Sequence, residues 1–352
     1  MTDAAAPDSG SPRSHRSGLS RRAALRRGLA LAAAMAGAVP GRLPAVAGPT
    51  HLIIDLGPGG EGGDWSTATA VNGAGQVAWT WATAIDADRG VIDNIHPCLW
   101  EQGAARDLSA LGLLDINGLA EDGSVLGSDG PRALLVAPGA AAAEPLPGFE
   151  GDAFATAISP GGLIAWVISG LPVSLRGRDL LPLPLPEGFG FFLPSSVNDR
   201  GTLAVIVLPP APGAENGSAA AINAAGLVVG GSASLGMRSI AGAGRAFRHD
   251  LATGQTLDLG SLPGYARSRA TAIDGAGRVL GFSTDAAPDR PFRAAWLWDE
   301  TAGMTDLNSL VPAGAGWLLS DAFAINDAGW IAGQGAFMGQ RRGYLLVPAP
   351  TA

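Results

Sequence analysis

Apolar and polar residues alternate along much of the chain with the two-residue period of β-strands. Residues 269–273 and 321–325 alternate in this way up to an Asp or Asn, and an apolar run such as 227–229 follows shortly after such a position. Successive side chains of a strand point to opposite faces of a sheet, so an alternating run indicates a half-buried strand. The pattern therefore predicts pairs of strands joined by tight turns.

One phrase of this kind, close to Ala-Ile-Asn-x-x-Gly-x-Val, recurs seven times. Its copies are 70–77, 118–125, 157–164, 196–203, 221–228, 272–279 and 324–331. The glycines at its fourth turn position are spaced by 48, 39, 39, 25, 51 and 52 residues. Spacings of about 40 to 50 residues are typical of propeller blades of four strands, whereas 25 residues are too few for one.

Turn chemistry accounts for the whole phrase. Asn, Asp or Ser at the first turn position can accept a hydrogen bond from the backbone two residues on. Gly at the fourth position, such as Gly75 or Gly277, supplies the positive φ of a type I turn followed by a bulge. The phrase is therefore interpreted as a hairpin signal and not as a phosphate or metal loop.

A second phrase lies between the hairpins and ends in Asp-Leu. Its copies are 98–108, 246–260 and 295–307. It has the pattern of a strand, a turn and a strand, so two hairpins together give four strands per unit.

The two ends of the proposed domain complement each other. Residues 52–57 match a fourth strand without the other three, and 342–347 match a third strand without a fourth. If the first strand completes the last blade, no sheet edge stays exposed. A solenoid would need distinct capping repeats at both ends, and none is visible. We therefore predict an all-β fold, a β-propeller closed by strand 52–57.

The number of blades is predicted less sharply. Residues 203–208 read as one strand, but the Pro-rich segment 209–213 cannot lie in a central strand. Either a half-blade is inserted or one blade is degenerate. The prediction is six to seven four-stranded blades, with six full units and a fragment as the literal count.

The first 47 residues have the layout of a cleaved export signal. A basic segment containing Arg21 and Arg22 precedes a short apolar run, and a cleavage site with Ala45 and Ala47 follows. The paired arginines resemble the twin-arginine type of signal, with the ordinary secretory route as the alternative. The predicted domains are the signal, 1–47, and a single repeat domain, 48–352.

Charge and composition narrow the partners of the processed chain. All 23 basic residues are Arg, and beyond residue 47 there are 16 of them against 29 acidic residues, a net charge of −13. This balance excludes a nucleic-acid binder driven by phosphate neutralisation. Cys98 is the single cysteine, so no intrachain disulfide can form. We expect a soluble monomer in the periplasm or outside the cell, with no membrane span after processing.

The two phrases together resemble those of the HAF-repeat extracellular proteins. The likeness covers residues 51–347 and is strongest at 219–310 and 322–347. The resemblance implies an exported repeat protein and assigns no reaction. Many relatives end in a sorting signal with a membrane stretch, but here Val347 and Pro348 stand close to the last residue, so that anchoring does not carry over.

Few residues suit catalysis. His51, His96 and His249 show no zinc-ligand spacing, and no zinc-protease, nucleophile-elbow or phosphate-loop phrase occurs. His96 and His249 are interpreted as surface or edge histidines on third strands. Cys98 takes the Phe position of its phrase and is interpreted as a small buried hydrophobe. No cofactor is expected.

One weak candidate for calcium is the cluster Asp86, Asp88 and Asp93. Alternate carboxylates before a Gly resemble a shortened calcium loop. A solvated insertion between second and third strands is the other interpretation.

The nine tryptophans are many for this chain and follow the repeat in part. Most recur at second and third strands, where packing between blades explains them. Trp65, Trp81 and Trp317 fit the repeat less well, and they could stack on sugar rings near a channel mouth.

Three functions remain open. The first is a non-catalytic exported propeller that binds a glycan, peptide or protein, and the second is a structural component of the cell envelope. The third is a carbohydrate-active lyase or glycoside hydrolase, with acids such as Glu61, Asp64 and Asp152 in the central funnel. Propellers host both binding and catalysis, so the fold does not choose among them.

Overall fold

The computed structural model describes most of the second of two compact units of the chain, residues 44–352. The described segments are 50–57, 65–86, 91–146, 153–168, 171–176, 179–182, 195–204, 216–233, 243–286 and 293–350. The predicted export signal, 1–47, lies outside them. Within these segments no helix is long and apolar enough to cross a membrane.

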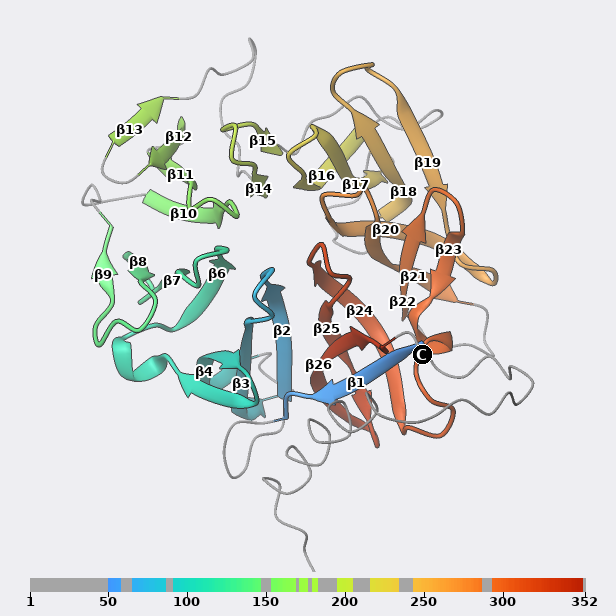
Figure 1. Ribbon diagram of the computed structural model, residues 1–352, viewed down its shortest axis with the longest axis horizontal. Coiled ribbons are helices and arrows are strands. Elements are labelled where there is room, and N and C mark those ends of the chain that lie inside the picture. Colours follow the sequence, from blue (N-terminus) through green and yellow to red (C-terminus); the bar gives the residue numbers. More distant parts are fainter. Residues whose placement is uncertain are drawn as a thin grey trace, which may run out of the picture. The chain divides into compact units, whose positions relative to one another are not determined.

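The first half of the unit forms three four-stranded antiparallel sheets in chain order (Figure 1). The first contains β2 (Trp65–Val71), β3 (Val77–Asp86), β4 (Val91–Glu101) and β5 (Ala104–Asp107). The second contains β6 (Asp115–Leu119), β7 (Val125–Ser128), β8 (Ala133–Val136) and β9 (Glu144–Pro145). The third contains β10 (Ala153–Ile158), β11 (Ile164–Ile168), β12 (Leu171–Arg176) and β13 (Asp179–Pro182).

The second half adds a two-stranded sheet and three further four-stranded sheets. The short sheet pairs β14 (Ser196–Val197) with β15 (Leu203–Ala204). The next contains β16 (Asn216–Ile222), β17 (Leu227–Ala233), β18 (Ala243–Asp250) and β19 (Thr256–Gly260). It is followed by β20 (Tyr265–Ile273), β21 (Val279–Ala286), β22 (Arg293–Asp299) and β23 (Gly303–Asp306). The last contains β24 (Trp317–Ile325), β25 (Ile331–Phe337), β26 (Gln340–Pro348) and β1 (His51–Asp55).

Two short 3-10 helices follow fourth strands, η2 (Ser109–Leu111) and η3 (Leu307–Ser309). The Asp of the Asp-Leu phrase precedes each helix and accepts a hydrogen bond from the backbone N–H two residues on, from Ser109 to Asp107 and from Asn308 to Asp306. Such short-range capping explains why Asp recurs at this place.

The N-terminal strand completes the C-terminal sheet, as the sequence predicts. β1 pairs antiparallel with β26, with His51 opposite Pro348 and Asp55 opposite Tyr344. The strand runs from His51 to Asp55 and not over 52–57. The edge of β26 is therefore covered by a segment from the other end of the unit.

All seven copies of the turn phrase adopt one conformation. Their fourth residues, Gly75, Gly123, Gly162, Gly201, Gly226, Gly277 and Gly329, have φ between +77° and +90°. Each of these glycines donates its N–H to the carbonyl of the first turn residue at 2.9–3.2 Å. The predicted type I turn with a left-handed fourth residue is thus confirmed.

The side chain at the first turn position bonds further along the chain than we predicted. The acceptor atom of Asn72, Ser159, Asn198, Asn223, Asp274 or Asn326 takes the N–H four residues on, at 2.8–3.0 Å. The predicted bond two residues on occurs in addition at Asn198 and Asn223. The bulge that follows the turn brings the N–H of the residue four positions on back toward the side chain of the first turn residue. This side chain therefore closes the whole loop.

The seven turns are hydrogen-bonded to one another in a closed cycle, which we call the turn ring (72–75, 120–123, 159–162, 198–201, 223–226, 274–277 and 326–329). Four amide groups carry it. Nδ2 of Asn72, Asn198, Asn223 and Asn326 donates to the first turn carbonyl of the next phrase, at 2.8–3.1 Å. The bond from Asn326 to Asn72 joins the last turn to the first.

Backbone and carboxylate groups make the three remaining links of the turn ring. Glu121 N–H donates to the Pro160 carbonyl at 2.9 Å. Gly161 and Gly275 N–H donate to the carboxylates of Asp199 and Asp327, at 2.6 and 2.8 Å. Every turn is therefore tied to the next.

At Asp274 a charged pair replaces the missing amide donor. The Asp274 carboxylate accepts from Arg278 Nε at 2.5 Å, and Arg278 Nη2 donates to the Asp327 carbonyl at 3.0 Å. Asp274 is 3% exposed, so its charge would be costly without this partner. Arg278 thus supplies the donor that Asn provides elsewhere.

Apolar clusters fill the space between each sheet and the next. Trp296 and Val279 pack on Val229 and Ala246 of the preceding sheet. Equivalent clusters join the other neighbours, and Ala332 and Leu345 of the last sheet pack on Ala68 and Trp79 of the first. In Figure 1 the first strands, such as β2, β6 and β24, lie nearest a common centre.

The first strands share an irregularity that the sequence pattern does not reveal. Six of them skip a residue in the register at the same place, three positions before the first turn residue. The residue skipped by the register is Thr69, Asn117, Thr156, Ala220, Thr271 or Phe323. A bulge re-aims the side chain of the extra residue.

Second and third strands pair a large residue with a small one. Gly230, Gly281 and Gly333 on second strands lie opposite Phe247, Trp296 and Tyr344 on third strands. A Cβ at Gly281 would collide with the Trp296 ring, and one at Gly333 would collide with the Tyr344 hydroxyl. The smaller residue leaves the space that the larger one needs.

In the first sheet the large and small residues are exchanged. Trp79 takes the glycine position on β3 and lies opposite Cys98 on β4. Both are buried, at 1% and 2% exposure. The buried thiol stands at an aromatic position because Trp79 already fills the space across the strand pair.

Reversing this exchange is expected to show strong coupling. Cys98→Trp alone overfills the interface and Trp79→Gly alone leaves a cavity, so each should destabilise the fold by about 2–5 kcal/mol. The double variant recreates the pair of Gly281 and Trp296. Its loss of unfolding free energy should be smaller than the sum of the two single losses by at least about 1 kcal/mol. Urea unfolding measures all three.

The matched control is the double variant Cys98→Trp with Trp100→Gly. It has the same amino-acid composition as the first double variant but does not exchange a large and a small residue across the β3–β4 pair. Trp100 lies on the same strand as Cys98, opposite Val77 of β3 and Ala105 of β5. Equal coupling in both double variants would contradict the size-exchange account.

The turn ring allows a second test at Asn223. Asn223→Asp keeps the acceptor for Leu227 N–H but removes the amide donor to the Asp274 carbonyl, which should cost about 1–3 kcal/mol. Adding Leu227→Arg recreates the Asp274–Arg278 pair, because Leu227 approaches Gly277 as Arg278 approaches Gly329. The double variant should regain a substantial part of the loss in a melting experiment.

Leu227→Arg alone serves as the control and should not stabilise the protein. A double variant no more stable than Asn223→Asp would show that the amide donor is not what Arg278 replaces.

Candidate ligand-binding pocket

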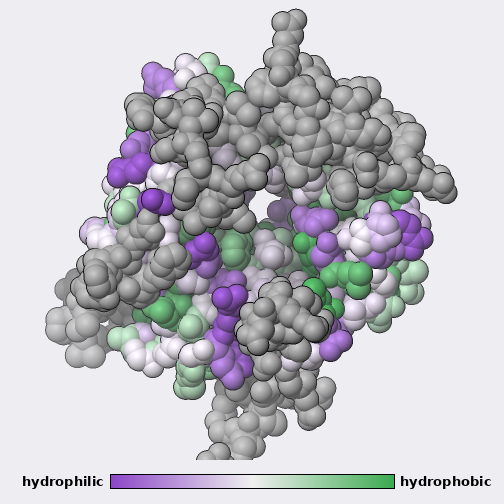
Figure 2. Space-filling model, turned by 180° about the vertical axis from the view of Figure 1, so that it is seen from behind, coloured by the Kyte–Doolittle hydropathy of each residue, from purple (hydrophilic) through white to green (hydrophobic). Residues whose placement is uncertain are grey.

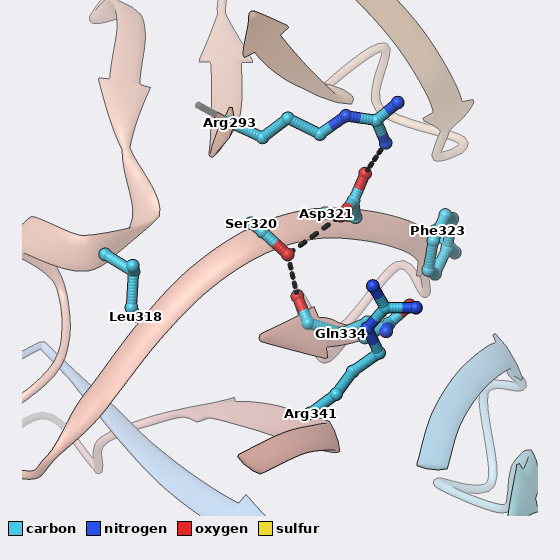
Figure 3. A pocket seen from close by; sticks show the side chains of 7 residues that line it. All are labelled: Arg293, Leu318, Ser320, Asp321, Phe323, Gln334 and Arg341. Carbon is cyan, nitrogen blue, oxygen red and sulfur yellow. Dashed lines mark hydrogen bonds and ion pairs between the residues drawn. The ribbon is translucent and has the colours of Figure 1, made fainter. Parts of the chain in front are cut away.

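A pocket of about 530 Å³ opens beside β24 (Figure 3). Its lining comes from the last sheet and from the start of β22 in the sheet before it. The residues are Arg293, Leu318, Ser320, Asp321, Phe323, Gln334 and Arg341, and we call it the Arg341 pocket. Volumes of roughly 300–1,000 Å³ are typical of small-molecule sites.

One side of the pocket is an ion pair held in place by its surroundings. Arg293 Nη1 lies 2.6 Å from Asp321 Oδ1, and the Arg293 guanidinium lies over the Phe282 ring at 4.3 Å. The other carboxylate oxygen of Asp321 accepts from the Ser320 hydroxyl at 2.8 Å. Asp321 is 7% exposed, so its position is fixed by burial as well as by these bonds.

The opposite side holds an exposed arginine oriented by an amide. With the Gln334 amide placed so that Oε1 faces its neighbours, Oε1 accepts from Arg341 Nε at 3.0 Å and from Trp65 Nε1 at 3.2 Å. Trp65 belongs to the first sheet, so Gln334 also joins two sheets here. Figure 3 shows Arg293 and Arg341 on either side of Ser320 and Asp321.

The apolar part of the lining comes from Phe323 and Leu318. Phe323 is one of two residues that the register of β24 skips, the other being Ser320, and the bulge there re-aims its side chain. Leu318 is 40% exposed. The pocket therefore combines two guanidiniums, one carboxylate, a hydroxyl and an amide with an aromatic ring.

The face opposite to that of Figure 1 is hollowed near its centre (Figure 2). Hydrophilic and hydrophobic residues both gather at the border of the hollow.

A second pocket of about 450 Å³ lies beside β6 and β10. Asn117 and Thr156, the bulge residues of these two strands, line it together with Asp115 and Arg132. Its arginine differs from Arg341, because Arg132 donates through Nε to Asp129 at 2.8 Å.

Several residues predicted from sequence lie outside the described part of the chain. These are Arg21, Arg22, Ala45 and Ala47 of the export signal, the acids Glu61, Asp64 and Asp152, and Asp88 of the calcium candidate. Asp86 and Asp93 belong to the paired strands β3 and β4, with Asp86 opposite Val91 and Asp93 opposite Ala84. Among the residues that the structure describes, no group of three His, Cys, Asp or Glu side chains could hold a metal ion.

The histidines have ordinary structural partners. His96 stacks on Trp81 at a centroid distance of 4.0 Å and lies 3.0 Å from an oxygen of Asp107. His249 is 5% exposed, lies between Val228 and Thr256 of the two neighbouring strands and bonds the Thr256 hydroxyl at 2.8 Å, so its interpretation as a surface or edge histidine was wrong. Burial, and next the charge of Arg278, lower the pKa of His51.

Cys98 is a buried hydrophobe, as predicted. Burial first, and the Asp107 carboxylate next, raise its pKa to about 12. A thiol in this state is a poor nucleophile at neutral pH. Burial also acts to raise the pKa of Asp107, but hydrogen bonds from Ser109 and His96 outweigh it and leave that pKa below its usual value.

The three tryptophans outside the repeat pattern have different roles. Trp81 is buried under His96, and Trp317 stacks on Phe337 at 5.0 Å at the start of β24. Trp65 contacts the amide that orients Arg341. Only Trp65 is therefore linked to the Arg341 pocket by a hydrogen bond.

Sequence reasoning missed the polar residues of the Arg341 pocket. Ser320 and Asp321 lie in an alternating run that predicts only a strand, and Arg293 belongs to the neighbouring unit. One signal was available: the residue three positions before the first turn residue is Phe323 in the last copy and small or polar in the others.

Comparisons with known proteins support the fold alone. No protein-family model matches the chain, and no curated protein is similar to it in sequence. Among solved structures, the chain is similar to the extracellular domain assigned to a hybrid two-component system of B. thetaiotaomicron (TM-score 0.53, 12% identity). This match covers 86% of the chain and 40% of that domain, so the chain spans about two fifths of its length.

A second structure of that extracellular domain, assigned to a one-component system, gives a TM-score of 0.51 at 12% identity, with 84% of this chain and 39% of that one covered. An oligogalacturonate lyase from Vibrio parahaemolyticus gives a TM-score of 0.49 at 10% identity, with 86% and 97% covered. The chain has a propeller-type all-β fold, and the described residues form six four-stranded antiparallel sheets and one two-stranded sheet.

Proposed function

We propose that this chain is an exported, non-catalytic β-propeller that binds a small ligand in the Arg341 pocket. The observation that carries the proposal is the convergence of Arg293, Ser320, Asp321 and Arg341 around an open cavity beside the aromatic ring of Phe323. A few fixed polar groups beside apolar surface are the usual composition of a binding site.

The architecture proposed here is a closed ring of seven blades, one of them abbreviated. Three observations support it: the cycle of the turn ring, the apolar clusters between consecutive sheets, and the pairing of β1 with β26. The two-stranded sheet of β14 and β15 is the abbreviated blade, and it explains the short spacing of 25 residues between Gly201 and Gly226.

Export and family membership belong to the same proposal. The paired arginines of the first 47 residues support export, and the two repeated phrases support a place among the HAF-repeat proteins.

Binding is tested by screening the purified full chain against glycans and peptides and comparing Phe323→Ala with the unmodified protein. A ligand held in the Arg341 pocket should bind about tenfold more weakly to the variant, because an aromatic contact at a buried site contributes on the order of 1–2 kcal/mol. Calorimetry measures the affinity.

The matched control is Thr69→Ala, which changes the same bulge position in the first sheet, outside the pocket lining. Ligands that bind both variants equally would place binding elsewhere and contradict the proposal.

Export is tested by replacing both Arg21 and Arg22 with Lys and fractionating cells that express the full chain. The twin-arginine route reads the guanidinium pair, so the variant should stay in the cytoplasm while the unmodified chain reaches the periplasm. Replacing Arg26 and Arg27 with Lys is the control and should leave export intact. Undiminished export of the first variant would favour the ordinary secretory route, and retention of the unmodified chain would contradict export.

A further inference from the structure

The Arg341 pocket carries an excess positive charge in an acidic protein. Two guanidiniums and one carboxylate line it, and that carboxylate, Asp321, is already paired with Arg293 at 2.6 Å. Among the described residues no carboxylate forms an ion pair with Arg341. The whole chain has a net charge of −8, so a cation in a cavity with no carboxylate partner among the described residues is a local feature and not a reflection of composition.

We propose that the Arg341 pocket binds a small carboxylate, and this inference rests on the proposed function of the pocket as a ligand site. The two Nη groups of Arg341 hold the carboxylate end-on. Guanidinium and carboxylate groups match in a bidentate geometry, and such charge-assisted bonds are stronger than neutral ones.

The contacts of Arg341 favour this geometry over a general attraction. Its Nε is already occupied by Gln334 Oε1, which is itself fixed by Trp65 Nε1. A guanidinium held through Nε has its plane set in advance and presents its Nη groups together. The ligand then does not have to order a free side chain, which lowers the cost of binding.

The rest of the pocket suits a small hydroxylated body attached to the carboxylate. Phe323 offers an aromatic ring, and the Ser320 hydroxyl, whose single proton goes to Asp321 or to the Gln334 carbonyl, can accept a hydrogen bond from the ligand. The volume of about 530 Å³ accommodates a sugar-sized molecule. A uronate combines these features, and a simple organic acid shares the carboxylate alone.

The second pocket is the internal comparison. Arg132 donates to Asp129 through Nε and through the backbone N–H, so its charge is compensated. The pocket beside β6 should therefore show no preference for carboxylates.

The test is calorimetry of the full chain with glucuronate and with its neutral amide, glucuronamide, as a pair that differs only at the carboxyl group. Glucuronate should bind at least about tenfold more tightly than the amide, since one charge-assisted pair is lost. Arg341→Gln should lower glucuronate affinity by about tenfold or more, and Arg341→Lys should recover only part, because an ammonium group cannot bond in the bidentate geometry.

Asp321→Asn provides a readout of opposite sign. It removes the one negative charge of the pocket and should raise glucuronate affinity, a gain that damage to the fold cannot produce. Arg245→Gln is the matched control: Arg245 stands near the start of the third strand β18, pairs with Asp258 and lines neither pocket. It should leave the affinity unchanged.

The remaining outcomes separate the two proposals. Binding of succinate as tight as glucuronate supports a carboxylate from a simple organic acid, whereas tighter glucuronate supports an acidic sugar. Three results would overturn the proposal of a carboxylate ligand. They are equal binding of glucuronate and glucuronamide, binding of inorganic phosphate or of an acidic peptide in place of small carboxylates, and an Arg341→Gln variant with unchanged affinity. If a neutral ligand then still binds more weakly to the Phe323→Ala variant, the proposed function stands without the carboxylate. If no ligand responds to either substitution, both fall.

Discussion

The hydrogen bond from one turn amide to the carbonyl of the next turn is the interaction on which this arrangement depends. It requires a single side chain to provide two groups: an acceptor that closes its own turn, and a donor that reaches the neighbouring sheet. Asn satisfies both, as Asn72, Asn198, Asn223 and Asn326 show. Where the sequence has Asp274, Arg278 is recruited for the second task. A short polar phrase thus links sheets whose main contacts are otherwise apolar and non-directional.

The strand pattern and the turn phrase could be predicted because both are local. Alternation specifies a strand within a few residues, and a glycine such as Gly277 specifies a left-handed turn residue by itself. The pairing of β1 with β26 followed from counting strands at the two ends. The link from Asn326 to Asn72 could not be read in this way, because it joins residues 254 positions apart and depends on how sheets stack.

The pocket was beyond prediction for the same physical reason. Arg293 belongs to one repeat unit, Asp321 to the next, and Trp65 to the other end of the unit that the structure describes. Within each unit these residues look like ordinary strand positions, and only the meeting of sheets gives them a common role. Bulges add a second difficulty: a one-residue shift in β24 re-aims Phe323 without changing the alternation on either side.

The position of β1 has a consequence for how this chain reaches its native state. His51 and Pro348, which face each other across two strands, are separated by about 300 residues. A ribosome must release the final segment before that sheet can gain its fourth strand, so the sheet cannot be completed while the chain is still being made. Synthesis and completion of the fold are therefore separate events. The entropic cost of bringing these distant segments together arises in the last step.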